Sequence, residues 1–322
     1  MEAVSPAIDQ SGIKGFQKRP DLFRLICWVA AAATVAVLAW IIFEIARQAT
    51  PSIQKFGLDF LTNSKWVPNR NVYGVAPFLI GTTVSSLIAL LFALPLGLAI
   101  AIFLSEDFLP LPVRQIVRFT VEMLAAIPSV VYGLWGIFVV IPLVHAFGEW
   151  AVVAFKNLPV LNTLFAPPAY GNSMLTASLV LALMILPTIT AISRSALVAV
   201  PGTLREGAYA LGSTRWEAIF GVILPTAAPG IVAATILALG RAMGETMAIA
   251  MLIGNSSRLT WSLLSPAGTL AGLLANQFGE AEGLQVSSLM YAALLLVVLT
   301  LFVNVIGELI LRYTLKKTAG MR

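Results

Sequence analysis

The chain has 322 residues, of which 59% are hydrophobic and 11% are charged, and its formal net charge is +5 at pH 7. Soluble domains carry about 25% charged residues, so this composition excludes an ordinary soluble protein and indicates a protein embedded in a membrane. Most basic residues stand in short clusters between apolar runs rather than in one patch. This distribution argues against a nucleic-acid partner and predicts contact with membrane lipid.

Six apolar runs are each long enough to cross a bilayer, because about 20 helical residues span its hydrocarbon core. They cover residues 22–48, 76–104, 116–147, 173–198, 227–254 and 286–312. We therefore predict an all-α integral membrane protein with six transmembrane helices, organised as an N-terminal tail over 1–21 and a transmembrane domain over 22–322. Cleavage of the first run as a signal peptide is an alternative, although the run exceeds the roughly 7 to 15 apolar residues of an ordinary signal.

Basic residues near the span ends predict the orientation of the helices. Thirteen Lys and Arg residues flank the spans on the side of the two termini, and six flank them on the other side. Because the excess of Lys and Arg marks the cytoplasmic side, both termini are expected in the cytoplasm. The remaining basic residue, Arg241, lies inside the fifth run and belongs to neither set.

The chain has one cysteine, Cys27, and one histidine, His145. A lone cysteine cannot form an intramolecular disulfide, and we expect Cys27 to pack as a small core residue. No metal site or bound cofactor is predicted for this chain. An intramembrane serine protease is an alternative class, but it would need a histidine base beside its nucleophile, and no G-x-S-x-G segment occurs.

The connection between the fourth and fifth runs, residues 199–226, has the pattern of two short helices. Two T-x-x-E sequences, which start at Thr203 and Thr214, match the capping box that begins a helix. Gly212 between them suits the left-handed residue that ends the first helix. The connection is therefore predicted to form a rigid knuckle.

The segment EGAYALGSTRWEAIFGVILP in this connection resembles the EAA loop of ABC importer permeases. That pattern is E-A-A, three residues, G, nine residues, I, one residue and L-P. The matching positions are Glu206, Ala208, Gly212, Leu224 and Pro225, while Gly207 replaces an alanine and Val222 replaces the isoleucine. The resemblance implies that the loop docks on a separate ATPase and couples ATP hydrolysis to transport. A purely structural role, in which Glu206 caps a helix and Gly212 ends it, is the alternative.

The chain has no G-x-x-x-x-G-K-[ST] sequence, so ATP and its Mg ion would have to be bound by another polypeptide. This absence is what a transport subunit that is not itself an enzyme requires.

Three further stretches narrow the resemblance. They are LPLGLAIAIFLSE over 94–106, VEMLAAIPSVVYGLWG over 121–136 and GRAMGETMAIAMLIGN over 240–255. Together with the EAA loop they are similar to the permeases of phosphate-specific ABC importers, the PstC type, from about residue 60 onwards. The resemblance implies a type I ABC importer permease fold in the bacterial inner membrane. It also implies a heterodimer with the sister permease PstA, two copies of the ATPase PstB and the external phosphate-binding protein PstS.

The substrate implied by this resemblance is inorganic phosphate, but the RAMGE segment is similar to segments of sulfate and molybdate permeases as well. Import of another oxyanion is therefore an alternative. A secondary transporter driven by an ion gradient is a further alternative, although no inverted repeat is evident and such a protein would not need an EAA loop.

Arg241 and Glu245 place two charges inside an apolar segment. Each charge costs about 2.5–3.5 kcal/mol to insert, whereas an i,i+4 ion pair returns only about 0.2–0.5 kcal/mol in water. A functional reason is therefore favoured. On one helix the two side chains would share a face, and we expect Arg241 to bind an oxyanion in the translocation path while Glu245 holds Arg241 between cycles. A structural ion pair that bridges to another helix is the alternative.

Overall fold

The computed structural model describes residues 22–106, 108 and 110–319. The predicted tail over 1–21 therefore lies outside the described residues. The chain divides into two compact units, which cover residues 1–47 and 48–322.

The described part of the first unit is a single helical segment. It is the larger part of α1 (Leu22–Phe56), and every side chain from residue 22 to residue 43 is exposed within the chain. Cys27 is among them, so the prediction that it packs in a core is wrong for the isolated chain. An apolar surface of this extent needs lipid or another polypeptide to cover it.

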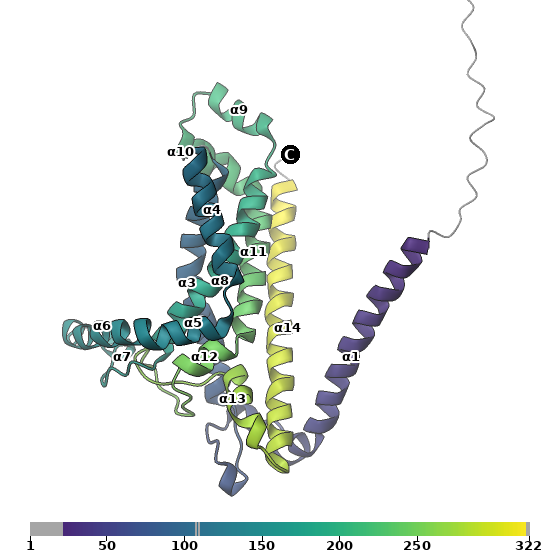
Figure 1. The fold of residues 1–322 in the computed structure, drawn as a ribbon, viewed down its shortest axis with the longest axis vertical. Helices are drawn as coiled ribbons and strands as arrows, with labels where there is room; N and C mark the ends of the chain where they lie inside the picture. The colour runs from purple at the N-terminus through teal and green to yellow at the C-terminus, as the bar shows by residue number, and fades with distance from the viewer. Residues whose placement is uncertain (1–21, 107, 109, 320–322) are drawn as a thin grey trace, which may run out of the picture. The chain divides into compact units, whose positions relative to one another are not determined.

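The second unit consists of the end of α1 and a series of further helices (Figure 1). In chain order these are α2 (Asp59–Thr62), η2 (Pro68–Arg70), α3 (Ala76–Ser105), α4 (Leu111–Ala126), α5 (Ser129–Trp135), η3 (Gly136–Val140), α6 (Ile141–Ala154), α7 (Pro159–Leu164), α8 (Met174–Val198), α9 (Gly202–Ala210), α10 (Arg215–Ala218), η4 (Ile219–Ile223), α11 (Leu224–Gly244), α12 (Met247–Leu252), α13 (Leu270–Gln277), η5 (Phe278–Glu280) and α14 (Leu284–Ala319). Of the η elements, η3 and η4 are π-helices.

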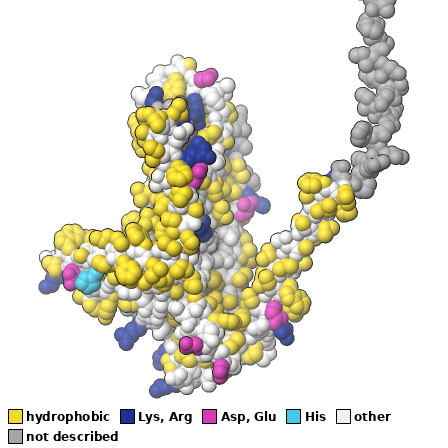
Figure 2. All heavy atoms as spheres, viewed as in Figure 1, with side chains coloured by type: hydrophobic (Ala, Val, Ile, Leu, Met, Phe, Trp, Pro, Cys, Tyr) yellow, Lys and Arg dark blue, Asp and Glu magenta, His cyan; other side chains and the backbone are white. Residues whose placement is uncertain are grey.

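Six helical stretches among the described residues are long and apolar enough to cross a membrane. They are Leu22–Phe56, Ala76–Ser105, Ser129–Ala154, Met174–Val198, Arg215–Gly244 and Leu284–Leu315. The prediction of an all-helical chain with six spans is confirmed at this level. Figure 2 shows apolar side chains spread over much of the visible surface, as expected of helices that face lipid or another subunit.

The third span differs from its prediction over 116–147. Helix α4 ends at Ala126, because Pro128 disfavours a helical conformation at Ile127, which is extended with φ −70° and ψ 126°. The candidate span is instead α5 to α6, which runs across the direction of α3, α8 and α11 (Figure 1). Helix α4 is a separate amphipathic helix, and an ion pair of 2.7 Å between Arg118 and Glu122 lies on its exposed face.

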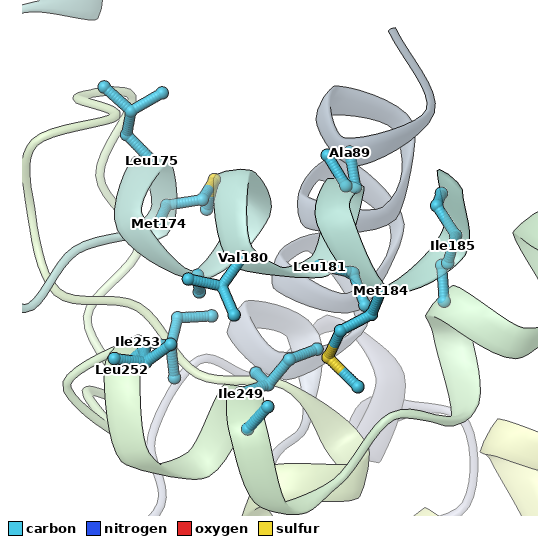
Figure 3. Close-up of a cluster of buried hydrophobic side chains, with 14 of the residues drawn as sticks. Ala89, Met174, Leu175, Val180, Leu181, Met184, Ile185, Ile249, Leu252 and Ile253 are labelled. Carbon is cyan, nitrogen blue, oxygen red and sulfur yellow. The ribbon is translucent and has the colours of Figure 1, made fainter. Parts of the chain in front are cut away.

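Helix α8 forms the centre of the core of the second unit. In the most apolar 18-residue stretch of α8, 72% of the residues are buried, whereas only 6% are buried in the most apolar stretch of α14. Val180 and Met184 of α8 lie against Ile249 and Leu252 of α12 (Figure 3). The position of α8 is therefore fixed by packing on several sides.

Helices α3 and α8 approach each other closely at Gly97. A Cβ atom at Gly97 would lie 2.9 Å from Cγ2 of Ile189, and Thr190 donates a hydrogen bond from Oγ1 to the Gly97 carbonyl at 3.3 Å. Small residues let membrane helices approach because no side chain separates their backbones. The two helices therefore form a tightly packed pair.

An aromatic cluster lies at the end of the second unit opposite to α9 (Figure 1). Phe60 stacks on Tyr291 with ring centroids 4.4 Å apart, and Trp66 meets Tyr73 edge-on at 4.9 Å. Burial raises the pKa of the Tyr73 hydroxyl. The cluster joins the segment before α3 to the start of α14.

Candidate functional site

The connection over residues 199–226 folds as the predicted knuckle. Helix α9 ends near Gly212, whose φ of +85° lies in the left-handed region, and Thr214 forms a complete capping box with Glu217 at the start of α10. Both features were predicted. The first capping box was wrong: α9 begins at Gly202, so the N-cap is Pro201, whose side chain has no oxygen to form a capping box.

The tip of the knuckle is open. Glu206 and Gly207 are exposed, and Leu211 is 89% exposed, which is unusual for a leucine on a short connection between helices. A Cβ atom at Gly207 would meet no atom within 4 Å, so the departure from the alanine of the EAA pattern has no steric cause in this chain. The tip therefore has room for a docking partner.

The other residues of the EAA pattern lie at the base of the knuckle. Ala208 is buried on the inner face of α9, while Leu224 and Pro225 begin α11 directly after η4. Leu224 packs against a buried cluster that α3, α8 and η4 share. The pattern thus combines an exposed tip with an anchored base.

Arg241 lies near the end of α11 and is exposed within the chain. Its Nη1 atom donates a hydrogen bond to Oγ1 of Thr188 on α8, at 3.3 Å. The side chain lines a groove of about 570 Å³ between α8, α11 and α14. The lining residues are Thr188, Leu237, Gly240, Arg241, Thr300 and Asn304. A guanidinium has five N–H donors, so most of the donors of Arg241 remain available.

Glu245 does not share a helical face with Arg241, contrary to the prediction. Helix α11 ends at Gly244, and Glu245 has an extended backbone with φ −68° and ψ 130°. Glycine is a poor helix former, and the Thr246 hydroxyl donates to the Gly244 carbonyl at 3.1 Å, which competes with the helical pattern. Among the described residues no ion pair joins Arg241 to an acidic side chain.

Two polar residues of α14 face the groove beside Arg241. The Thr300 hydroxyl donates to carbonyl oxygens of its own helix at 3.0 and 2.9 Å, so its proton is already used. The Asn304 amide has no hydrogen bond to the described residues, and a Cβ atom at Gly240 would come within 3.4 Å of its Oδ1 atom. Asn304 was not among the predicted site residues, although a single amide inside the apolar stretch LFVNVIG is a visible signal of a functional position.

Tyr132 of α5 lines a separate, apolar hollow with Leu124 and Leu183. Its hydroxyl donates to the Leu124 carbonyl at 2.9 Å. No group of three or more His, Cys, Asp or Glu side chains that could hold a metal ion occurs among the described residues. The arrangement is suited to contact with an anion by hydrogen bonds and charge.

Comparisons with known proteins agree with this architecture. Residues 93–319 match the family model described as "Binding-protein-dependent transport system inner membrane component". The "Phosphate transport system permease protein PstC" of Mesorhizobium japonicum is 39% identical over 316 residues, which are 97% of this chain and 96% of that protein. The protein of the same description from Pasteurella multocida is 40% identical over 297 residues, which are 92% of each chain.

A solved structure of the MetNI methionine ABC transporter, in an inward-facing conformation, contains a chain of similar fold. The TM-score is 0.52 at 21% sequence identity, and the match covers 77% of this chain and 96% of that chain. The likeness shows the fold of a type I ABC importer permease. The family model covers more than half of the chain and the relatives exceed 30% identity over nearly all of it. The chain belongs to the family of inner-membrane components of binding-protein-dependent transport systems.

Proposed function

We propose that the chain is a permease subunit of an ATP-driven importer of inorganic phosphate, and that the groove around Arg241 forms part of the path of the anion. The observation that carries this proposal is an exposed guanidinium on a membrane-spanning stretch that makes one hydrogen bond and no ion pair among the described residues. The relatives named as phosphate transport system permeases support phosphate as the substrate.

The energetics of Arg241 favour a transient anionic partner. A central arginine costs about 2.5–3.5 kcal/mol to insert, and one neutral hydrogen bond returns only about 0.5–1.5 kcal/mol. A bidentate contact with a tetrahedral oxyanion uses the planar fork of the guanidinium and adds charge attraction. The groove therefore gains its largest stabilisation when an anion occupies it.

Asn304 and Thr188 complete the polar side of the groove. An amide both donates and accepts, so Asn304 can bind either a bare or a protonated phosphate oxygen, whereas sulfate offers no proton at neutral pH. Glu245 follows the end of α11, where its backbone N–H donates to the Ala242 carbonyl and its side chain makes no ion pair with Arg241 among the described residues. Its proposed role is to hold Arg241 between transport cycles, in a conformation in which the link after Gly244 brings the two side chains together.

The exposed tip of the knuckle, with Glu206, Gly207 and Leu211, docks on the ATPase subunit. The remaining partners are the sister permease PstA, two copies of the ATPase PstB and the phosphate-binding protein PstS. The knuckle and both termini then lie in the cytoplasm, in agreement with the excess of basic residues on that side. ATP and Mg are bound by the ATPase and not by this chain.

The substrate is tested with the complete complex in liposomes that are loaded with ATP on the ATPase side. Uptake of labelled phosphate, sulfate and molybdate is measured in the presence of the matching binding protein. Phosphate uptake that needs ATP is the expected result. Uptake of sulfate or molybdate without uptake of phosphate would show that the substrate is another oxyanion. Uptake driven by an ion gradient without ATP would show that the protein is a secondary transporter.

Replacement of Asn304 by leucine is expected to lower phosphate uptake per assembled complex by about tenfold, because a hydrogen bond to a charged ligand contributes about 1.5 kcal/mol or more. Thr300→Val is the matched control in the same groove. Its hydroxyl proton is bound within its own helix, so uptake should stay near the level of the unchanged protein. Equal losses in the two variants would contradict the role of Asn304.

A further inference from the structure

The inner face of the knuckle is fastened to two helices by one side chain, that of Arg205 on α9. Its Nη1 atom lies 3.2 Å from Oε1 of Glu106, the residue that follows α3. Its Nη2 atom donates to the Leu197 carbonyl in the last turn of α8, at 2.7 Å. A single guanidinium therefore joins α9 to the ends of α3 and α8.

This ion pair is largely shielded from solvent. The side chain of Arg205 is 22% exposed and that of Glu106 is 11% exposed, beside a small cavity of about 210 Å³. The exposed pairs Arg118–Glu122 and Arg312–Glu308 are formed within one helix each, whereas the Arg205–Glu106 pair connects residues of distant segments. A shielded ion pair adds little stability compared with apolar packing, because both charges lose water. Such an ion pair is better suited to fixing one arrangement of α9 relative to the end of α3.

Aromatic rings make a second attachment between the knuckle and the segment after α3. Phe108 stacks on Trp216 of α10 with centroids 5.1 Å apart, and Trp216 stacks on Phe220 of η4 at 5.9 Å. Phe103 of α3 meets Phe108 edge-on at 5.4 Å. Both short helices of the knuckle are thus held against the end of α3.

The attachment continues to the groove through rigid packing. Helices α3 and α8 are packed tightly at Gly97 and Thr190, as described above. Two residues before Thr190 on α8 lies Thr188, whose hydroxyl accepts the hydrogen bond from Arg241. A displacement of Arg205 would therefore move the pair α3–α8 and, with it, the partner of Arg241.

We propose that Arg205, paired with Glu106, is the positioning residue that transmits movement of the docked knuckle to α3 and α8, and so ties the Arg241 groove to the nucleotide state of the ATPase. This inference rests on the proposed function, since it needs an ATPase at the tip of the knuckle. The chain itself joins the knuckle to α8 through residues 199–201, which are not helical, and to α11 through η4. Arg205 bridges this non-helical link by its bonds to Leu197 and Glu106. Without them, the ATPase still docks and hydrolyses ATP, but the link absorbs much of the movement before it reaches α8 and α3.

The test is the ratio of ATP hydrolysed to phosphate imported by the complete complex in liposomes. Arg205→Met should raise this ratio at least tenfold while the ATPase stays bound, and Arg205→Lys, which keeps the charge, should restore part of the coupling. Glu106→Gln should raise the ratio as well. The ratio of the double variant should not exceed that of Arg205→Met, because both substitutions remove the same interaction. Arg118→Met, which breaks an exposed ion pair on α4, is the control and should leave the ratio unchanged.

The outcomes separate this inference from the proposed function. If hydrolysis and uptake fall together at a constant ratio, or if Arg205→Met loses the ATPase, Arg205 only supports the fold or the docking shape and the inference is overturned. If the unchanged complex imports no phosphate, the proposed function itself fails, whatever the variants do.

Discussion

Replacement of Arg241 by glutamine should reduce ATP-driven phosphate uptake by about tenfold to a hundredfold in a complex that still assembles. Glutamine keeps hydrogen-bond donors but removes the charge, and charge-assisted hydrogen bonds contribute about 1.5–3 kcal/mol. The measurement is the initial rate of uptake by reconstituted complexes, normalised to the amount of complex. Arg241→Lys should give an intermediate rate, since an ammonium keeps the charge and loses the planar fork.

Arg258 provides the matched control for this experiment. It is an exposed arginine in the segment after α12 and lines no part of the groove around Arg241. Arg258→Gln should leave the rate of uptake unchanged. Normal uptake by Arg241→Gln would exclude this side chain from the path and would favour a structural role for its contact with Thr188.

Replacement of Gly97 by leucine should destabilise the chain by about 1–3 kcal/mol, or prevent its accumulation in the membrane. The reason is the lack of space between α3 and α8, where even a Cβ atom would come within 2.9 Å of Ile189. The measurement is the temperature at which the detergent-purified complex loses its folded structure. A melting temperature unchanged by Gly97→Leu would show that the two helices are not held at this distance.

The control for this substitution is Gly207→Ala on α9. A Cβ atom at Gly207 meets no atom within 4 Å, so a methyl group is accommodated there and thermal stability should be kept. A large loss of stability in this variant would indicate that glycines matter through the backbone rather than through close packing.

The sequence predicts the long helices well because their composition alone decides them. A run of about 20 apolar residues has no other stable arrangement in lipid, and α3, α8 and α14 lie where these runs predict them. The knuckle was also predictable, because Gly212 and the box at Thr214 are local signals that act within a few residues.

Breaks inside apolar runs were harder to predict. The signal for the end of α4 was present in Pro128, but a proline inside a membrane helix is often tolerated, and only packing decides between a kink and a break. The end of α11 at Gly244 had a weaker signal still. It separates Arg241 from Glu245, so the shared helical face inferred from their spacing was wrong.

Contacts between distant segments could not be predicted from one sequence. Nothing in the order of residues brings Arg205 to Glu106, or Asn304 to Gly240, because these contacts arise only when helices pack. The sequence shows which charged and polar residues are present, but it does not show which distant residues they contact.

The π-helix η4 sets the rotational phase between the knuckle and the groove. An α-helix turns by about 100° per residue, so one residue more or less between α10 and α11 would swing every later side chain to a different side of the helix axis. With η4 at Ile219–Ile223 as it is, Trp216 points to the segment after α3 while Arg241 points to α8. Insertion or deletion of one residue in this stretch should therefore disturb the groove far more than a substitution there.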